Sequence, residues 1–417
     1  MSSIKDFLDI SKERVEHSLE LHRKSIIIDQ SKAGEPVVWS DAQVKKMNEM
    51  LEAGNTEVIL NSGNKEIEKI RLAELLTPDS WTRRKYADLL KNSGVTCISK
   101  TCGVFSMEDS MNSLAAMHLK FDKLRDILIH ATCAEDIMRA KKEEKHAVIL
   151  DFQNTTMITE PPFDLDKQLD RLDLFYGLGI RVIQLTYNLR NFVGDGCTER
   201  QDSGLSRFGL KVVERMNKLG ILVDTGHSGI KTTIEAAEMS KDPIAATHTC
   251  CRSVYFHERG KTDEALKAVA ETGGVIGIVM VPMFLGRVVE EEGKWKAGTL
   301  KDMLDHIDYA VNLVGVNHVG IGTDTADIPG QPEDERVMEG MNKMIHSFWY
   351  GFRPGPPPEG HEHGRGLHVY PPRPDSLEAW SNWPNITVGL VSRGYSDQEI
   401  QKIIGGNWLR LYKKVIG

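Results

Sequence analysis

Residues 208–224 read FGLKVVERMNKLGILVD, a stretch that combines a helical pattern with a short apolar run. Its apolar residues lie at the spacing of one helix face and stop before Gly220: Phe208, Val212, Met216 and Leu219. The run ILVD that follows has no polar alternation, which is typical of a parallel strand buried on both faces. The stretch therefore predicts a helix that leads directly into a buried strand.

Eight apolar runs of this kind occur along the chain, with helical stretches between them. They are residues 25–29 (SIIID), 95–100 (VTCISK), 147–151 (AVILD), 181–186 (RVIQLT), 221–224 (ILVD), 244–248 (IAATH), 274–279 (GVIGIV) and 318–322 (HVGIG). Capping signals at Thr299, and at Ser396 with Glu399, predict the starts of two later helices. Eight strand–helix units favour an α/β fold of the (β/α)8 TIM barrel type, and a doubly wound sheet stays open as the alternative.

Segments that interrupt the repeat are expected to lie mostly at one end of the barrel. Residues 1–25 have an amphipathic helical pattern. Residues 35–79, 188–206 and 327–384 follow the first, fourth and eighth strands, and we interpret them as a partly helical insertion, a long loop and a Pro/Gly-rich loop. In a barrel all three leave from the C-terminal face, where active sites lie. We expect a single barrel domain over residues 1–417 with these insertions.

The composition is that of an ordinary soluble globular protein, with 40% hydrophobic and 27% charged residues among 417. A net charge of −8 gives no electrostatic reason to expect nucleic acid or a membrane surface as partner, so we expect a small-molecule substrate. Six cysteines without framework spacing indicate reduced thiols. With no signal-peptide pattern and no apolar run of ~20 residues, these features predict a cytoplasmic protein. Assembly into a homodimer is left open.

Polar side chains of metal-binding types follow several of the predicted strands. They are Asp151, His227, His248 and Asp324. The carboxyl ends of barrel strands meet at one rim, and histidine with carboxylate is a usual ligand set for hydrolytic zinc. The residues therefore form a candidate metal and acid/base cluster. The alternative is that each of them only caps a strand or a helix.

Five motifs in the chain resemble the membrane (renal) dipeptidase family of the amidohydrolase superfamily. They are GLGIRVIQLTYNLRN, GLSRFGLKVVERMNKLGILVDTGHS, PIAATHTCCRSV, GVNHVGIGTDTAD and WPNITVGLVSRGYSDQEIQKIIGGNWLRLY, in family order from about Asp166 onward. The resemblance implies a (β/α)8 barrel with a two-zinc site that hydrolyses dipeptides. It places His227 and His248 on two metal-binding histidines. It also places Arg259 on the arginine that holds the substrate carboxylate, and Asp324 on the acid/base aspartate.

The chain departs from the family pattern at the other metal ligands. Ser31 and Ala33 stand where the family has a His-x-Asp pair. Gln153 stands on the bridging glutamate, and Asp151 lies two residues earlier on the same face of the strand. The resemblance therefore predicts at most one zinc per chain, held by the two histidines with Asp151 or Gln153. The second site is doubtful because Ser31 and Ala33 replace its ligands.

Tyr187 occupies the position of a family histidine that steadies the oxyanion, and a phenol can still donate one hydrogen bond there. Tyr187 is therefore both a catalytic and a substrate-binding candidate.

Three functions remain open at this point. The favoured one is a dipeptidase-like metallohydrolase that cleaves a small amide or peptide bond in a carboxylate-bearing substrate by metal-activated water. The second is a lyase or isomerase on the same barrel, in which the metal or Lys32 stabilises an enolate-like intermediate. The third is a catalytically inactive dipeptidase-like binding protein. The first is favoured because His227, His248, Arg259 and Asp324 all persist together.

Overall fold

The fold is a parallel, nearly closed barrel surrounded by helices. A computed structural model describes residues 4–31, 36, 38, 40–53, 65–159, 164–286, 289–291, 294–296, 298–324 and 382–417. Neighbouring strands follow the order β1 (Ile28–Asp29), β2 (Cys97–Gly103), β4 (His146–Phe152), β5 (Ile180–Gln184), β6 (Leu222–Asp224), β7 (Ala245–Thr249), β8 (Val275–Ile278) and β11 (Val319–Ile321). Gln30 N donates to Ile321 O at 3.2 Å, which brings the last strand back to the first. The predicted (β/α)8 barrel is confirmed, and each of the eight runs contains or overlaps one of these strands.

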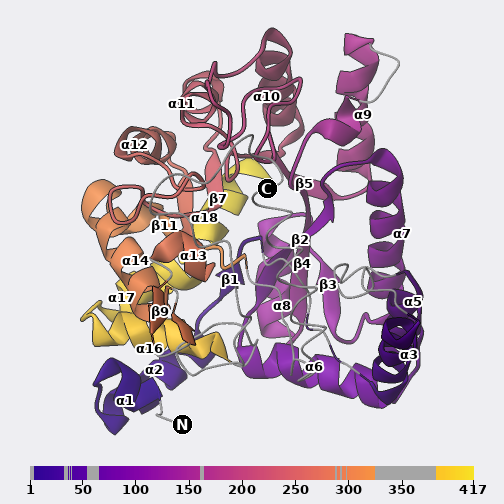
Figure 1. The fold of residues 1–417 in the computed structure, drawn as a ribbon, viewed down its shortest axis with the longest axis vertical. Helices are drawn as coiled ribbons and strands as arrows, with labels where there is room; N and C mark the ends of the chain where they lie inside the picture. The colour runs from indigo at the N-terminus through magenta and orange to yellow at the C-terminus, as the bar shows by residue number, and fades with distance from the viewer. Residues whose placement is uncertain are drawn as a thin grey trace.

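The strands alternate with helices, most of which lie outside the barrel (Figure 1). They are α1 (Ile4–Leu8), α2 (Lys12–Lys24), α3 (Asp41–Glu52), α5 (Lys65–Leu76), α6 (Trp81–Ser93), α7 (Met107–Lys123), α8 (Ala134–Lys142), α9 (Leu165–Gly177), α10 (Arg207–Leu219), α11 (Ile230–Met239), α12 (Asp263–Glu271), α13 (Pro282–Leu285), α14 (Leu300–Val314), α16 (Pro384–Ser392), α17 (Asp397–Gln401) and α18 (Asn407–Val415). The 3-10 turns η1 (Thr156–Ile158) and η2 (Val316–His318) and the π-helical turn η4 (Lys402–Gly406) complete the set of described helical elements.

The predicted helix boundaries match the local capping contacts. Thr299 begins α14 with a capping box to Asp302, and Ser396 begins α17 with a capping box to Glu399. Gly220 ends α10 in the left-handed conformation, with φ of 72°. Each of these helices therefore starts or stops where its sequence signal lies.

Two short strand features were not predicted. Strand β3 (Leu128–His130) pairs with the first half of β4, whereas β5 pairs with the second half. Strands β9 (Val289–Glu291) and β10 (Lys294–Lys296) form a small antiparallel pair after β8. Each is only three residues long, so none of them produces a periodic signal.

The three predicted insertions have different outcomes. Within residues 35–79 the structure describes helices α3 and α5, as expected. Residues 188–206 form a loop with two isolated bridges, Gly194 to Leu205 and Gly196 to Ser228. The segment at 327–384 lies outside the described residues except for its last three positions.

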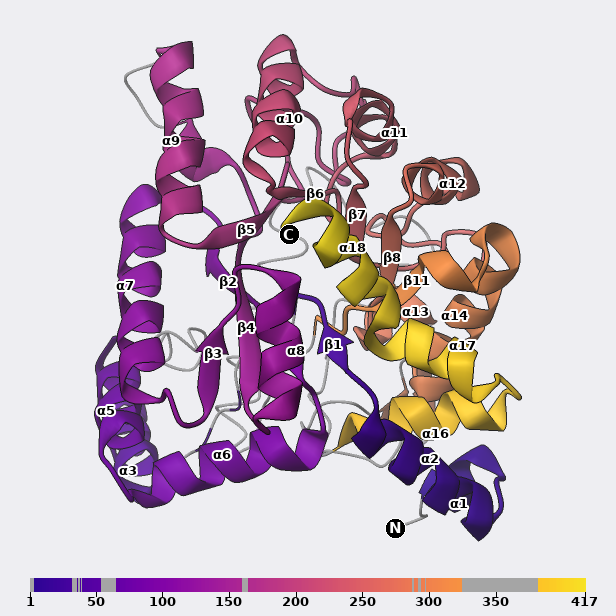
Figure 2. The ribbon, with the colours of Figure 1, turned by 180° about the vertical axis from the view of Figure 1, so that it is seen from behind.

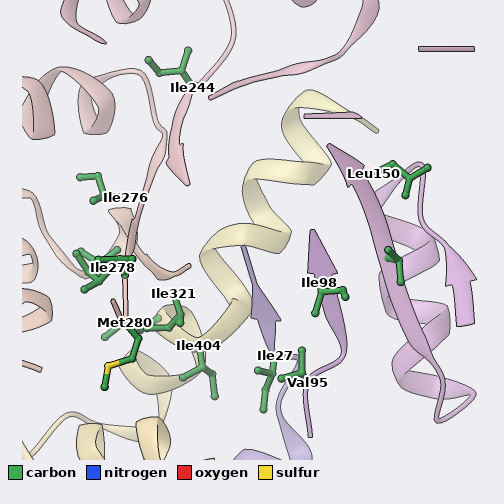
Figure 3. Packing of buried hydrophobic residues seen from close by; sticks show 14 of the residues in the cluster. Ile27, Val95, Ile98, Leu150, Ile244, Ile276, Ile278, Met280, Ile321 and Ile404 are labelled. Atoms are coloured by element: carbon green, nitrogen blue, oxygen red, sulfur yellow. The ribbon is translucent and has the colours of Figure 1, made fainter. Parts of the chain in front are cut away.

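Outward-facing strand residues pack under the ring of helices (Figure 3). Ile404 of η4 lies between Ile321 of β11 and Ile27, next to β1, where the barrel comes back on itself. The turn η4 therefore covers the seam between the first strand and the last.

Helix α18 lies across the N-terminal end of the barrel, where its apolar side chains close the interior (Figure 2). Its Trp408, Leu411, Tyr412 and Val415 pack against the inward-facing residues Ile28, Cys97, Ala147, Val182, Leu222, Ala245 and Val275. Trp408 Nε1 donates to Ile321 O at 3.0 Å, and Gln30 Nε2 donates to the hydroxyl of Tyr412. A barrel sealed at this end leaves the opposite, C-terminal end for a site.

Two inward-facing glycines make room for Trp408. A Cβ on Gly320 would lie 2.4 Å from Trp408 Nε1, and one on Gly277 would lie 3.0 Å from the same ring. Any larger residue at Gly320 would therefore displace the indole.

Two sequence expectations can be compared with the described helices and cysteines. All six cysteines are free thiols, as expected. None of the described helices is both long enough and apolar enough to cross a membrane.

Candidate active site

His227 lies in the turn after β6 and is buried. Its Nδ1 lies 2.7 Å from Asn188 Oδ1, and an amide oxygen can only accept. The ring therefore carries its hydrogen on Nδ1, which leaves the Nε2 lone pair available to a metal or a proton.

His248, within β7, is fixed by a chain of hydrogen bonds that begins at Asp224. Thr247 Oγ1 donates to Asp224 Oδ2 at 2.7 Å and lies 2.7 Å from His248 Nδ1. Asp224 also accepts from the backbone N–H groups of Thr247 and Gly226, both at 2.9 Å. Because the threonine hydrogen goes to Asp224, His248 Nδ1 must donate to the hydroxyl. Its buried Nε2 has no hydrogen-bond partner among the described residues.

The two imidazoles are neighbours in an aromatic row. Their ring centroids lie 4.9 Å apart at an interplanar angle of 63°. Tyr187 stacks on His227 at 4.1 Å, and Phe105 meets Tyr187 edge-on at 5.5 Å. Burial, together with the charge of Arg259, holds the pKa of both histidines well below its usual value, so both rings are neutral.

Arg259 is fully buried and contacts the backbone of both histidine-bearing segments. Its Nη1 donates to Gly226 O, and its Nη2 donates to His248 O at 3.0 Å. Its Nε lacks a partner, and no ion pair neutralises the guanidinium, within the described part of the chain. The side chain is thus a buried cation beside the two rings.

Asp324 follows β11 and is half-buried, with φ of 52° in the left-handed region. Burial raises the pKa of Asp324 to about 7, although the Arg259 charge opposes the rise. The charge of Asp29 also raises this pKa. Asp29 itself accepts hydrogen bonds from Thr323 N, Thr323 Oγ1 and Trp383 Nε1, each at 2.8 Å. A carboxyl with a pKa near 7 can both give and take a proton at neutral pH.

Asp151 and Gln153 lie at different depths in the barrel. Asp151 faces the interior, accepts from Ser99 Oγ through Oδ2, and has no described partner for Oδ1. Gln153 follows the strand, two residues or about 6.6 Å nearer the C-terminal rim. Burial raises the pKa of Asp151 to about 6.

A complete metal site does not assemble from the residues that the structure describes. Among them, no three histidine, cysteine, aspartate or glutamate side chains are arranged to hold a metal ion. The depth of Asp151 is consistent with this result, since Asp151 lies within β4, deeper in the barrel than Gln153, which follows the strand.

Of the two residues in the family's His-x-Asp positions, Ser31 alone is described. Ser31 Oγ lies 3.1 Å from Thr247 Oγ1, so the segment that follows β1 contacts the hydrogen-bond chain that fixes His248. Ala33 and Lys32 lie outside the described residues.

Three residues of the site were missed from the sequence. Asn188 and Thr247 fix the two histidines, and both adjoin predicted site residues, Tyr187 and His248 respectively. Lys261 is fully buried, and its Nζ donates to Ser228 O. Burial lowers the pKa of Lys261 to about 7. No sequence signal indicated a buried lysine at this position.

Comparison with known proteins identifies dipeptidases among the curated relatives of the chain. "Dipeptidase tcpJ" of Claviceps purpurea is 24% identical over 312 residues, which cover 74% of this chain and 60% of the relative. An uncharacterized dipeptidase of Schizosaccharomyces pombe is 28% identical over 314 residues, covering 74% and 62%. The chain thus spans less than two thirds of the length of these curated relatives.

Solved structures show the same fold. An amidohydrolase from Pseudomonas aeruginosa superposes with a TM-score of 0.66 at 26% identity, covering 95% of this chain and 98% of that one. The probable dipeptidase PvdM from the same organism gives a TM-score of 0.65 at 19% identity, with coverages of 97% and 98%. The second likeness concerns the fold alone.

A family model makes the assignment. The model of "Membrane dipeptidase (Peptidase family M19)" matches residues 81–346, which is more than half of the chain. The match includes β2 to β11 and the candidate site residues from Asp151 to Asp324. The protein therefore belongs to the membrane dipeptidase family, Peptidase family M19.

Proposed function

We propose that the protein is a dipeptidase-like, metal-dependent hydrolase that cleaves an amide or peptide bond in a small substrate with a free carboxylate. The observation that carries this proposal is the pair of neutral imidazoles, His227 and His248, whose hydrogen bonds leave both Nε2 lone pairs available. Family membership supports the same reaction class. We further propose that residues 1–417 form a single barrel domain that carries the activity. We also propose a cytoplasmic location, where cysteines remain as free thiols.

The two histidines fit a zinc ion as imidazole ligands. Both rings carry their hydrogen on Nδ1, and the buried His248 Nε2 has no partner among the described residues. We propose at most one zinc per chain, with Gln153 or Asp151 as a further ligand. When bound, zinc supplies a water of lowered pKa and polarises a carbonyl oxygen.

Three side chains are proposed to bind the substrate carboxylate, stabilise the oxyanion and transfer the proton. Arg259 is a buried cation without an ion pair in the described structure, which suits it to a substrate carboxylate. Burial raises the pKa of Tyr187, so the phenol keeps its hydrogen and can donate to an oxyanion. Asp324, with a pKa of about 7, can pass a proton to the leaving amine.

Metal analysis beside a screen of L,L- and L,D-dipeptides tests this proposal. We expect about one zinc per chain and hydrolysis of at least one dipeptide. The variant His248→Ala should lose both, and the matched control His118→Ala, an exposed histidine of α7, should keep both. Protein without bound metal and without turnover would support the inactive binding protein. Metal with no amide hydrolysis would support the lyase or isomerase.

A further inference from the structure

We propose that Lys261 is a positioning residue for the two site histidines. With Arg259 it forms a buried brace that holds the backbone on which His227 and His248 are carried. The catalytic consequence rests on the proposed hydrolase function, whereas the positioning itself can be measured without any substrate.

Four carbonyl groups at the two histidines accept hydrogen bonds from other segments of the chain. Arg259 donates hydrogen bonds to Gly226 O and to His248 O. Gly226 directly precedes His227, so both histidine-bearing segments are bound by the same side chain. Cys197 N donates to His227 O at 2.8 Å. Lys261 Nζ donates to Ser228 O, the carbonyl that follows His227. The turn that carries His227 is therefore fixed on both sides of the ring, and Lys261 provides one of the two sides.

The backbone of the brace is itself tied to the strand that carries His248. Lys261 N donates to Cys250 O at 2.9 Å, and Arg252 N donates to Lys261 O at 3.0 Å. Thr249 Oγ1 donates to Arg259 O at 2.9 Å. The brace thus links the β7 end, which bears His248, to the β6 turn, which bears His227. A shift of Lys261 would change the position of one ring relative to the other.

Burying a lysine without an ion pair costs desolvation free energy, which a residue that only fills space would not require. Lys261 is fully buried, and none of the described acidic side chains forms an ion pair with it. An apolar side chain of similar length would avoid the desolvation cost but would leave Ser228 O without its donor. The hydrogen bond to Ser228 O acts on the turn that bears His227, which is why a positioning role explains this residue better than packing does.

The experiment compares Lys261→Met with Lys120→Met in the full chain. Lys120 is a similarly buried lysine on the outer helix α7, at 8% exposure. Long-range ¹H–¹⁵N spectra of the metal-free proteins report which ring nitrogen of each histidine carries the hydrogen. We expect fixed Nδ1–H forms for His227 and His248 in wild type and in Lys120→Met, and exchange-broadened or mixed forms for His227 in Lys261→Met.

Kinetics supply the second measurement. With any dipeptide that wild type hydrolyses, Lys261→Met should lower kcat by about tenfold or more and change KM by less than about twofold. If Lys261→Met does not fold, the same measurements are made on Lys261→Gln, which keeps a polar side chain. A folded variant with wild-type histidine spectra and wild-type kcat would overturn the proposal. If wild type hydrolyses no dipeptide, the hydrolase function fails, and the spectra still decide the role of Lys261.

Discussion

Replacing Asp151 with asparagine should stabilise the protein above pH 6 and have little effect at low pH. Asp151 is buried, and burial raises its pKa from an ordinary 3.8 to about 6. Between these two values the folded protein keeps a proton that the unfolded chain has already lost. The free energy of unfolding therefore falls as the pH rises through this window. Above pH 6 the buried carboxylate is ionised, and the whole loss of stability is present.

The magnitude follows from the difference between the two pKa values. At about 1.4 kcal/mol per pH unit, the buried carboxylate costs about 3 kcal/mol above pH 6. Asparagine has nearly the same shape and carries no charge. Its side-chain oxygen can still accept from Ser99 Oγ, and its amide group can donate to the neighbouring Thr101 Oγ1, which has no other described partner.

The assay is urea unfolding of metal-free wild type and Asp151→Asn from pH 4 to pH 8. We expect the variant to gain stability relative to wild type as the pH rises, by up to about 3 kcal/mol. The variant Asp170→Asn, at an exposed position of α9, controls for the loss of one negative charge. A difference between Asp151→Asn and wild type that does not change with pH would refute the reasoning, as would a variant that is the less stable protein at pH 8.

Three further predictions concern the packing of α18 against the barrel, the hydrogen bonds that fix His248, and the proton transfer proposed for Asp324. Trp408→Ala should lower the free energy of unfolding by about 3–5 kcal/mol in urea titrations. Gly320→Ala should also lower it, because the added Cβ would lie 2.4 Å from Trp408 Nε1. In the double variant the two effects should partly cancel, and simple addition would argue against the packing described. Thr247→Val removes the hydroxyl between Asp224 and His248, so kcat should fall about tenfold or more and the ¹⁵N spectrum of His248 should no longer show a single Nδ1–H form. Asp324→Asn should lower kcat by about 10²–10⁴-fold and remove the kcat transition near pH 7, and a pH profile with that transition intact would exclude Asp324 as the proton carrier.

Most of the fold could be predicted from the sequence because it depends on local signals. Buried parallel strands appear as unbroken apolar runs, and the turn at Gly220 or the capping box at Ser396 needs only neighbouring residues. Strand β3 was missed because three residues are too few for a period. The position of α18 across the end of the barrel could not be predicted, since amphipathic spacing does not reveal which apolar surface a helix covers.

The candidate site was only partly accessible to sequence reasoning. His227 and His248 could be found because they lie near the carboxyl ends of predicted strands, and barrel strands end at one rim. The links that fix them run between strands, as in the contact of Ser31 with Thr247. Lys261 was missed for the same reason, because its burial depends on segments far away in the chain. Contacts of this kind leave no spacing that a single sequence can display.

The location of α18 also has a consequence for the order of events during translation. All eight barrel strands have been synthesised once residue 321 has been added, but the N-terminal end of the interior that they enclose is closed by residues 407–415. A nascent chain that ends between these points exposes an apolar lumen and the empty space beside Gly277 and Gly320. Such a chain is expected to remain dependent on the ribosome or on chaperones until α18 emerges. A fusion or deletion that keeps every strand but alters residues 402–417 should therefore yield insoluble protein.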